Sequence, residues 1–136
     1  MRAPESIGQS QSQNEESRAL LRDQRRALYA YKIVSEVPEG QRRDYKIVVN
    51  DFGANVLRSG LCAAIARLER EKGGRGGLLL GHLAGAGLPG LEGVSPDDLP
   101  GRVRALDVEA YMIATREVLQ MAAWLKRAAQ AIFGED

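Results

Sequence analysis

Few side chains in this 136-residue sequence could carry out covalent chemistry. It has one histidine, His82, and one cysteine, Cys62, so it can form neither a cluster of histidine ligands nor an internal disulfide. Both lie in apolar or alanine-rich segments, where a buried structural role is usual for these residue types. The paired carboxylates Asp97 and Asp98 are explained as acids in the first turn of a helix. We therefore expect no catalytic residue and no metal site.

Residues 85–90 (GAGLPG) match the Gly-x-Gly-x-x-Gly pattern of dinucleotide-binding folds. In those folds the pattern joins a strand to a helix, but here no strand pattern precedes it. Pro89 and Gly90 predict a loop in place of the helix start. The sequence also lacks the Gly-Lys-Ser/Thr of a P-loop. We interpret the match as chance and expect no cofactor and no small-molecule substrate.

Arginine and lysine side chains recur along one helical face near the N-terminus. Residues 1–75 hold 14 Lys and Arg against 10 Asp and Glu, and 15 of the 19 cations in the chain are arginine, whose fork of donors suits phosphate. In a helix Arg22, Arg25 and Lys32 share one edge, where they could meet successive phosphates. Tyr29 lies between them and could stack on a base. A solvated surface that binds nothing fits the same pattern.

The elements that must position these side chains are helices, because no strand alternation is found and alanine and leucine dominate. Polar residues 1–13 predict a disordered tail, and residues 14–136 a single helical domain. A first long helix should run to about Val37, where Pro38 stops it. We expect an all-α single compact bundle of five or six helices with long N- and C-terminal helices.

Apolar spacing indicates which faces of these helices are buried. The core stripe expected for the first helix is Leu20, Ala27, Tyr31 and Val34. The last helix shows the strongest apolar period and should run from an Asp107 cap to about Phe133.

Between the terminal helices, glycine and proline set the expected boundaries. Gly53 should bend or end a second helix, and Ser59 should cap a third. A short buried helix is expected near Leu80, and a second short helix should begin near Ser95 and end before Pro100.

Two large apolar residues, Ile113 and Trp124, fall beside the main stripe of the last helix. Such a side chain either closes the edge of the bundle or anchors a partner, since tryptophan is enriched at interface hot spots. No apolar run approaches the length of a membrane span, and the N-terminus has no signal-peptide pattern. Together with the single cysteine, these observations predict a soluble, cytoplasmic protein.

Residues 23–31 (DQRRALYAY) resemble the opening helix of the small helical subunit of Cmr-type (type III-B) CRISPR effector complexes. Residues 59–61 (SGL) resemble a helix start of the same family in mid-chain. The most specific match is residues 115–119 (TREVL) followed by residues 124–128 (WLKRA), on one long C-terminal helix. The similarity spans about residues 23–133.

The resemblance implies a non-catalytic assembly protein that stacks in several copies and touches the guide–target RNA duplex through basic surfaces. The implied partners are the backbone and large subunits of the complex, further copies of this chain, the guide RNA and the target RNA, without a membrane. A helical adaptor without direct RNA contact is the alternative. The residues that we expect to bind RNA are Arg22, Arg25, Arg26, Lys32, Arg42, Arg43 and Lys46, with Arg116, Lys126 and Arg127 as a second group.

Overall fold

The computed structural model describes residues 7–71 and 73–134, with side chains from Leu21 onward. Within these ranges it contains six α-helices, one 3-10 turn and no strand, which confirms the all-α class. The helices are α1 (Ile7–Ser35), α2 (Arg42–Ser59), α3 (Leu61–Arg70), α4 (Gly76–Ala84), α5 (Leu99–Ala105) and α6 (Val108–Phe133), and the 3-10 turn η2 (Glu39–Gln41) precedes α2.

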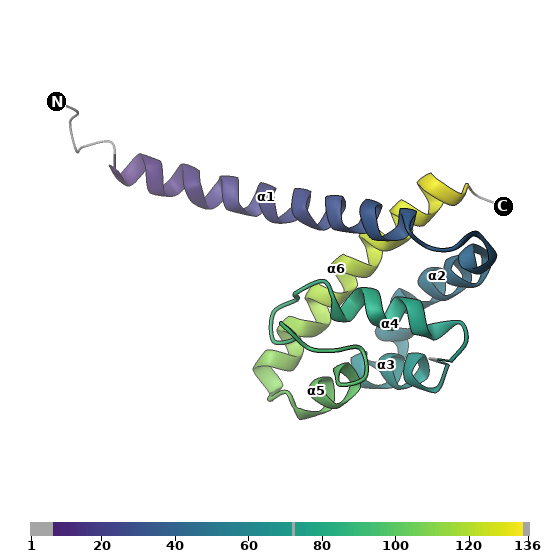
Figure 1. Cartoon of the computed structure of the whole chain (residues 1–136). Helices are drawn as coiled ribbons and strands as arrows, with labels where there is room; N and C mark the ends of the chain where they lie inside the picture. The colour runs from purple at the N-terminus through teal and green to yellow at the C-terminus, as the bar shows by residue number, and fades with distance from the viewer. Residues whose placement is uncertain (1–6, 72, 135–136) are drawn as a thin grey trace.

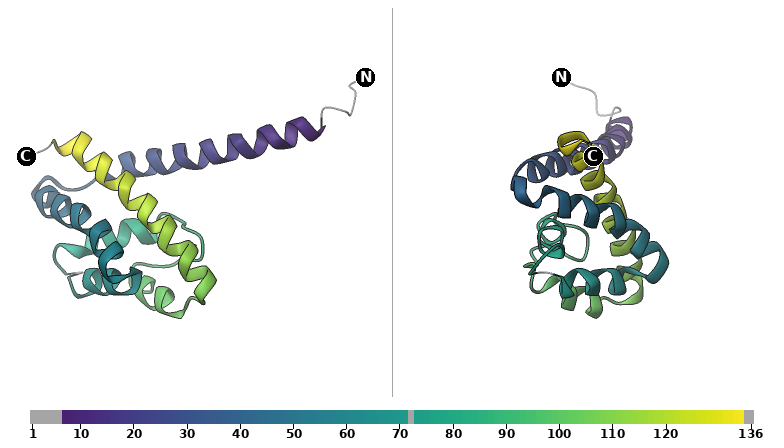
Figure 2. Two further views of the ribbon diagram at one scale, coloured as in Figure 1. Left: turned by 180° about the vertical axis from the view of Figure 1, so that it is seen from behind. Right: turned by 90° about the vertical axis from the view of Figure 1, so that its right-hand side faces the viewer.

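The two long helices cross, and the shorter ones gather on one side of that crossing (Figure 1). The C-terminal half of α1 packs on α6, which also packs along α2. α3 contacts α2, α4 and α5, so the short helices form the body of the bundle. The N-terminal half of α1 projects away from this body, as Figure 1 and the left view of Figure 2 show.

Helix α1 begins at Ile7 and so includes residues 7–13 of the expected tail, whose disorder stays a prediction. This stretch contains no proline and one glycine, and its glutamines are good helix formers, so nothing in it ends a helix that continues from residue 14. Residues 1–6 lie outside the described residues. That residues 14–136 form a single domain stays a prediction.

The buried face of α1 differs from the predicted stripe. Val34 is fully buried as expected, but Tyr31 is 41% exposed and Ala30 and Val37 are buried in its place. The buried face is turned around the helix axis relative to the predicted one, because long polar side chains of α1 also point into the protein. The spacing of apolar residues alone does not predict such a face. The side chain of Leu20 lies outside the described ones.

Local helix signals in the middle of the chain predict only some of the boundaries correctly. Gly53 does not end α2, which continues to Ser59, and Gly60 is the N-cap of α3 in place of Ser59. Pro100 does not end a helix but lies in the first turn of α5, where its missing N–H leaves no hydrogen bond unmade.

The short α4 helix and the start of α6 follow the prediction. Helix α4 is a short buried helix, with Leu79, Leu80 and Leu83 in the core. The Asp107 carboxylate caps α6 by accepting a hydrogen bond of 2.8 Å from the Ala110 N–H.

Candidate nucleic-acid interface

A buried polar cluster fixes the C-terminal half of α1 against the bundle. The Tyr29 hydroxyl donates to the His82 carbonyl oxygen on α4 at 2.7 Å. The Tyr45 hydroxyl on α2 lies 2.9 Å from His82 Nδ1, and the two rings meet edge to face. The sequence alone would allow Tyr29 to stack on a base, but in the structure its hydroxyl is used inside the protein, and burial raises its pKa. It therefore positions the cations of α1.

His82 has the environment of a structural residue. Burial lowers the pKa of its imidazole to about 4, so the ring is neutral at pH 7. Burial, followed by the nearby Tyr29, raises the pKa of Tyr45 above its usual value, so that hydroxyl keeps its proton and can donate to Nδ1. Cys62 is half-buried, and its backbone N–H donates to the Tyr111 hydroxyl at 2.9 Å. Among the described side chains, no group of three or more His, Cys, Asp or Glu is placed to hold a metal ion.

The structure places Arg26 differently from the other residues that were expected to bind RNA. Its guanidinium pairs with the Glu117 carboxylate at 2.6 Å and donates to Gln120 Oε1 at 2.6 Å. The side chains of Arg26 and Glu117 are only 11% and 7% exposed, so the pair joins α1 to α6 inside the contact between them. We therefore remove Arg26 from the residues expected to contact RNA.

The other α1 cations of the set remain at the surface. Arg22, Arg25 and Lys32 are exposed and form no ion pair with a described side chain. Arg22 and Arg25 line a hollow of about 450 Å³ between α1 and the loop after α4. The other residues that line it are Arg26, Tyr29, Ala86, Gly87, Leu88, Pro89 and Met121.

The basic residues at the start of α2 lie beside the end of α6. The Arg42 guanidinium lies 5.0 Å from the centroid of the Phe133 ring, and the Lys46 ammonium donates to the Gly134 carbonyl. Arg43 is exposed and forms no ion pair with a described side chain. This group is therefore partly engaged with the C-terminal end of α6.

The second predicted group, on α6, is not one cluster. Arg116 lies ten residues before Lys126, about 15 Å along a helix. Arg127 stacks its guanidinium over the Trp124 ring, 4.9 Å from the centroid. All three cations are exposed, but they do not form a single patch.

Trp124 lies at the edge of the core. It is half-buried, packs against the hydrophobic cluster, and its indole N–H donates to Asp23 Oδ1 at 3.1 Å. The bond ties α6 to α1, and Asp23 is not among the residues that line the hollow. Ile113 is 40% exposed.

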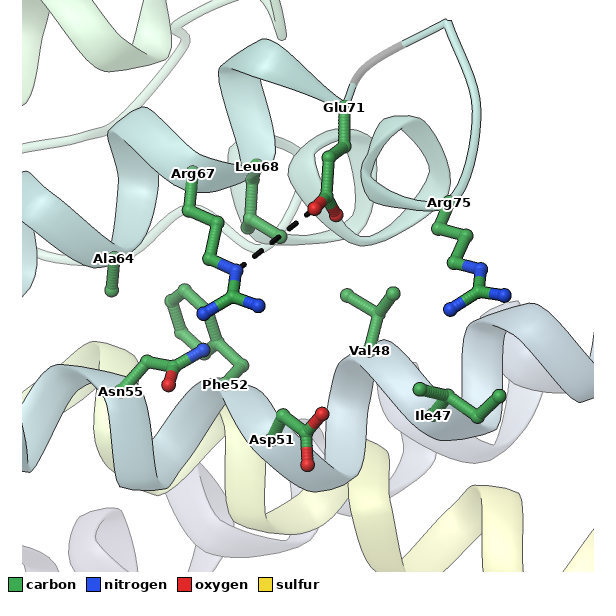
Figure 3. A pocket seen from close by; sticks show the side chains of 10 residues that line it. All are labelled: Ile47, Val48, Asp51, Phe52, Asn55, Ala64, Arg67, Leu68, Glu71 and Arg75. Atoms are coloured by element: carbon green, nitrogen blue, oxygen red, sulfur yellow. Dashed lines mark ion pairs between the residues drawn. The ribbon is translucent and has the colours of Figure 1, made fainter.

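A second depression, between α2 and α3, is shown in Figure 3. Its charged side chains partly neutralise one another, since Arg67 pairs with Glu71 at 3.9 Å and Asp51 lies across from them. No histidine or cysteine lines it. It offers no excess of positive charge for an anion.

Sequence reasoning missed the loop residues 86–89 and the pairing partner Glu117. The loop lies in a glycine-rich segment whose conformation no periodicity predicts. Glu117 lies on the buried side of α6, and the only available signal was a lone acid within an apolar face. No helix among the described residues has the length and hydropathy that a membrane span requires.

Comparisons with known proteins agree on one family. Residues 22–132 match a family model described as CRISPR-associated protein (Cas_Cmr5). The fold is similar to the crystal structure of a CRISPR-associated Cmr5 family protein from Thermus thermophilus, with a TM-score of 0.71 and 31% sequence identity. That match covers 82% of this chain and 96% of the other. No curated protein sequence matches the chain significantly.

Proposed function

Because the chain belongs to the Cmr5 family of CRISPR-associated proteins, we propose that it is the non-catalytic small subunit of a type III-B RNA-guided effector complex in the cytoplasm. It stacks there in several copies beside the backbone and large subunits. Basic helix faces contact the backbone of the guide and target RNA, and guide pairing supplies the sequence specificity.

The observation that carries this proposal is the unpaired positive charge on α1. Arg22, Arg25 and Lys32 are exposed, within the described residues no carboxylate neutralises them, and Tyr29 and Arg26 hold the helix that presents them. Counterion release from RNA phosphates would make such contacts favourable and dependent on salt. Several stacked copies would multiply contacts that are individually weak.

A helical adaptor without RNA contact is the competing function, and exposed apolar side chains favour it. Leu28 is 71% exposed, Val108 78% and Met112 67%. Large apolar side chains in these positions suit protein partners. Both functions are compatible with a subunit of a larger assembly, so the RNA contact needs its own test.

The test is RNA retention by the reconstituted complex at several salt concentrations, with the variant Arg25→Glu/Lys32→Glu. We expect weaker retention and a salt slope reduced by about 1.5, because two phosphate contacts are lost. Arg58→Glu/Arg70→Glu is the matched control, since both arginines are exposed and lie outside the proposed interface. Equal retention by the two variants favours the adaptor.

A further inference from the structure

Two glycines shape the hollow between α1 and the loop after α4. At Gly85 a Cβ atom would lie 2.9 Å from the Tyr29 hydroxyl, so only glycine lets the end of α4 come this close to α1. Gly87 has a φ of +65°, which side chains with a Cβ rarely adopt, and a Cβ there would meet nothing within 4 Å. The Gly-x-Gly spacing thus has a local geometric cause, and it leaves open space over the loop.

The two walls of the hollow differ in chemistry. On the α1 side, Arg22 and Arg25 contribute two charges without carboxylate partners among the described residues, while Glu117 already neutralises Arg26. On the other side Ala86 and Pro89 form a partly exposed apolar wall, beneath which Leu88 and Met121 are buried. Among the side chains that the structure describes, no acidic one lines the hollow. The matching ligand carries an anionic group and a flat apolar group side by side.

We propose that this hollow holds one unpaired nucleotide of single-stranded RNA, with its phosphate on Arg22 and Arg25 and its base against Ala86 and Pro89. This inference rests on the proposed function and adds a base-binding site to its backbone contacts. The volume of about 450 Å³ lies within the range of small-ligand sites. Guanidinium groups bind phosphate through paired hydrogen bonds, and unstacked bases also stack on guanidinium planes.

An unpaired nucleotide fits better than duplex backbone alone. A phosphate contact needs only the arginines and leaves the apolar wall unused. A base within a duplex is paired and stacked, so its faces cannot reach Pro89. A free mononucleotide shares the same chemistry and is distinguished from RNA by the test.

The test is an NMR titration of the ¹⁵N-labelled full chain with hexauridylate and with an abasic hexamer that has the same phosphates. We expect the amide signals of Gly87 and Leu88 to shift with hexauridylate, at a half-saturating concentration at least about fivefold below that of the abasic hexamer. Arg22→Gln/Arg25→Gln should weaken binding of both probes. Arg58→Gln/Arg70→Gln removes the same charge elsewhere and should change neither.

A filling variant separates the base from the phosphate. Ala86→Leu should abolish the preference for hexauridylate and keep the weaker, arginine-dependent binding of the abasic hexamer. If this variant fails to fold, the comparison of the two hexamers with the unsubstituted chain still shows whether the base contributes to binding.

Other outcomes would overturn the inference. Equal binding of both hexamers, still dependent on Arg22 and Arg25, would refute the base site and leave the proposed backbone contact standing. No shift at Gly87 or Leu88 up to millimolar hexauridylate would also refute it, and RNA retention by the complex would then decide the proposed function by itself. Uridine monophosphate that saturates as readily as hexauridylate would assign the hollow to free nucleotides instead.

Discussion

Acid should destabilise this protein through His82. The imidazole is buried, and its pKa is lowered to about 4, whereas the same group in the unfolded chain titrates near 6.5. Between these two values the unfolded state binds a proton that the folded state does not. Stability is therefore complete above about pH 6.5 and falls as the pH drops toward 4.

The size of the effect follows from the two pKa values. Between pH 7 and pH 5 the free energy of unfolding should fall by about 2 kcal/mol. Protonation of His82 also removes the hydrogen-bond acceptor at Nδ1, which lies 2.9 Å from the Tyr45 hydroxyl. The hydrogen bond that is lost joins α2 to α4.

The assay is urea unfolding at pH 7, 6 and 5, for the unsubstituted chain and for His82→Asn. Asparagine keeps an acceptor near the position of Nδ1 but does not titrate, so the variant should be less stable at pH 7 and lose less stability toward pH 5. Parallel pH profiles for the two proteins would show that other groups cause the acid sensitivity and that the lowered pKa of His82 is wrong.

Three further substitutions test the contacts that position the interface. Arg26→Met should lower the free energy of unfolding, measured by urea titration, by about 3 kcal/mol, because it leaves the Glu117 carboxylate buried and unpaired. Adding Glu117→Leu should recover much of this loss. If the effects of the two substitutions simply add, the ion pair does not stabilise the contact between α1 and α6. Tyr29→Phe should cost about 1 kcal/mol by the same method through its lost hydrogen bond, and an unchanged midpoint would mean that this bond does not hold α1. Trp124→Ala should lower the melting temperature of the isolated chain, by an amount equivalent to a loss of about 2 kcal/mol in the free energy of unfolding. An unchanged melting temperature together with defective assembly of the complex would instead show that Trp124 anchors a partner.

The last helix could be predicted because its signals are local. Twenty-six residues of regular apolar spacing define its buried face, and Asp107 caps it through a hydrogen bond to a residue three positions away. The α1 face could not be predicted from spacing, because Arg26 and Tyr29 point inward toward partners more than 50 residues away in the sequence. Their burial depends on Glu117 and on the His82 carbonyl, which no local pattern of α1 indicates.

The candidate interface was predictable to a similar degree. The exposure of Arg22, Arg25 and Lys32 follows from helical periodicity, and the structure agrees. The hollow beside them depends on a loop that α4 and α6 bring against α1, so the Gly-x-Gly spacing in it had no interpretable context in the sequence.

The most direct test of the central claim is photo-crosslinking within the assembled complex, with benzoylphenylalanine introduced at position 25 or 32 of α1 or at position 112 of α6. Arg25 and Lys32 lie seven residues apart on one face of α1, and Met112 is an exposed apolar residue of another helix. The account predicts crosslinks to guide or target RNA from positions 25 and 32, and to protein from position 112. Crosslinks to protein alone from all three positions would contradict it.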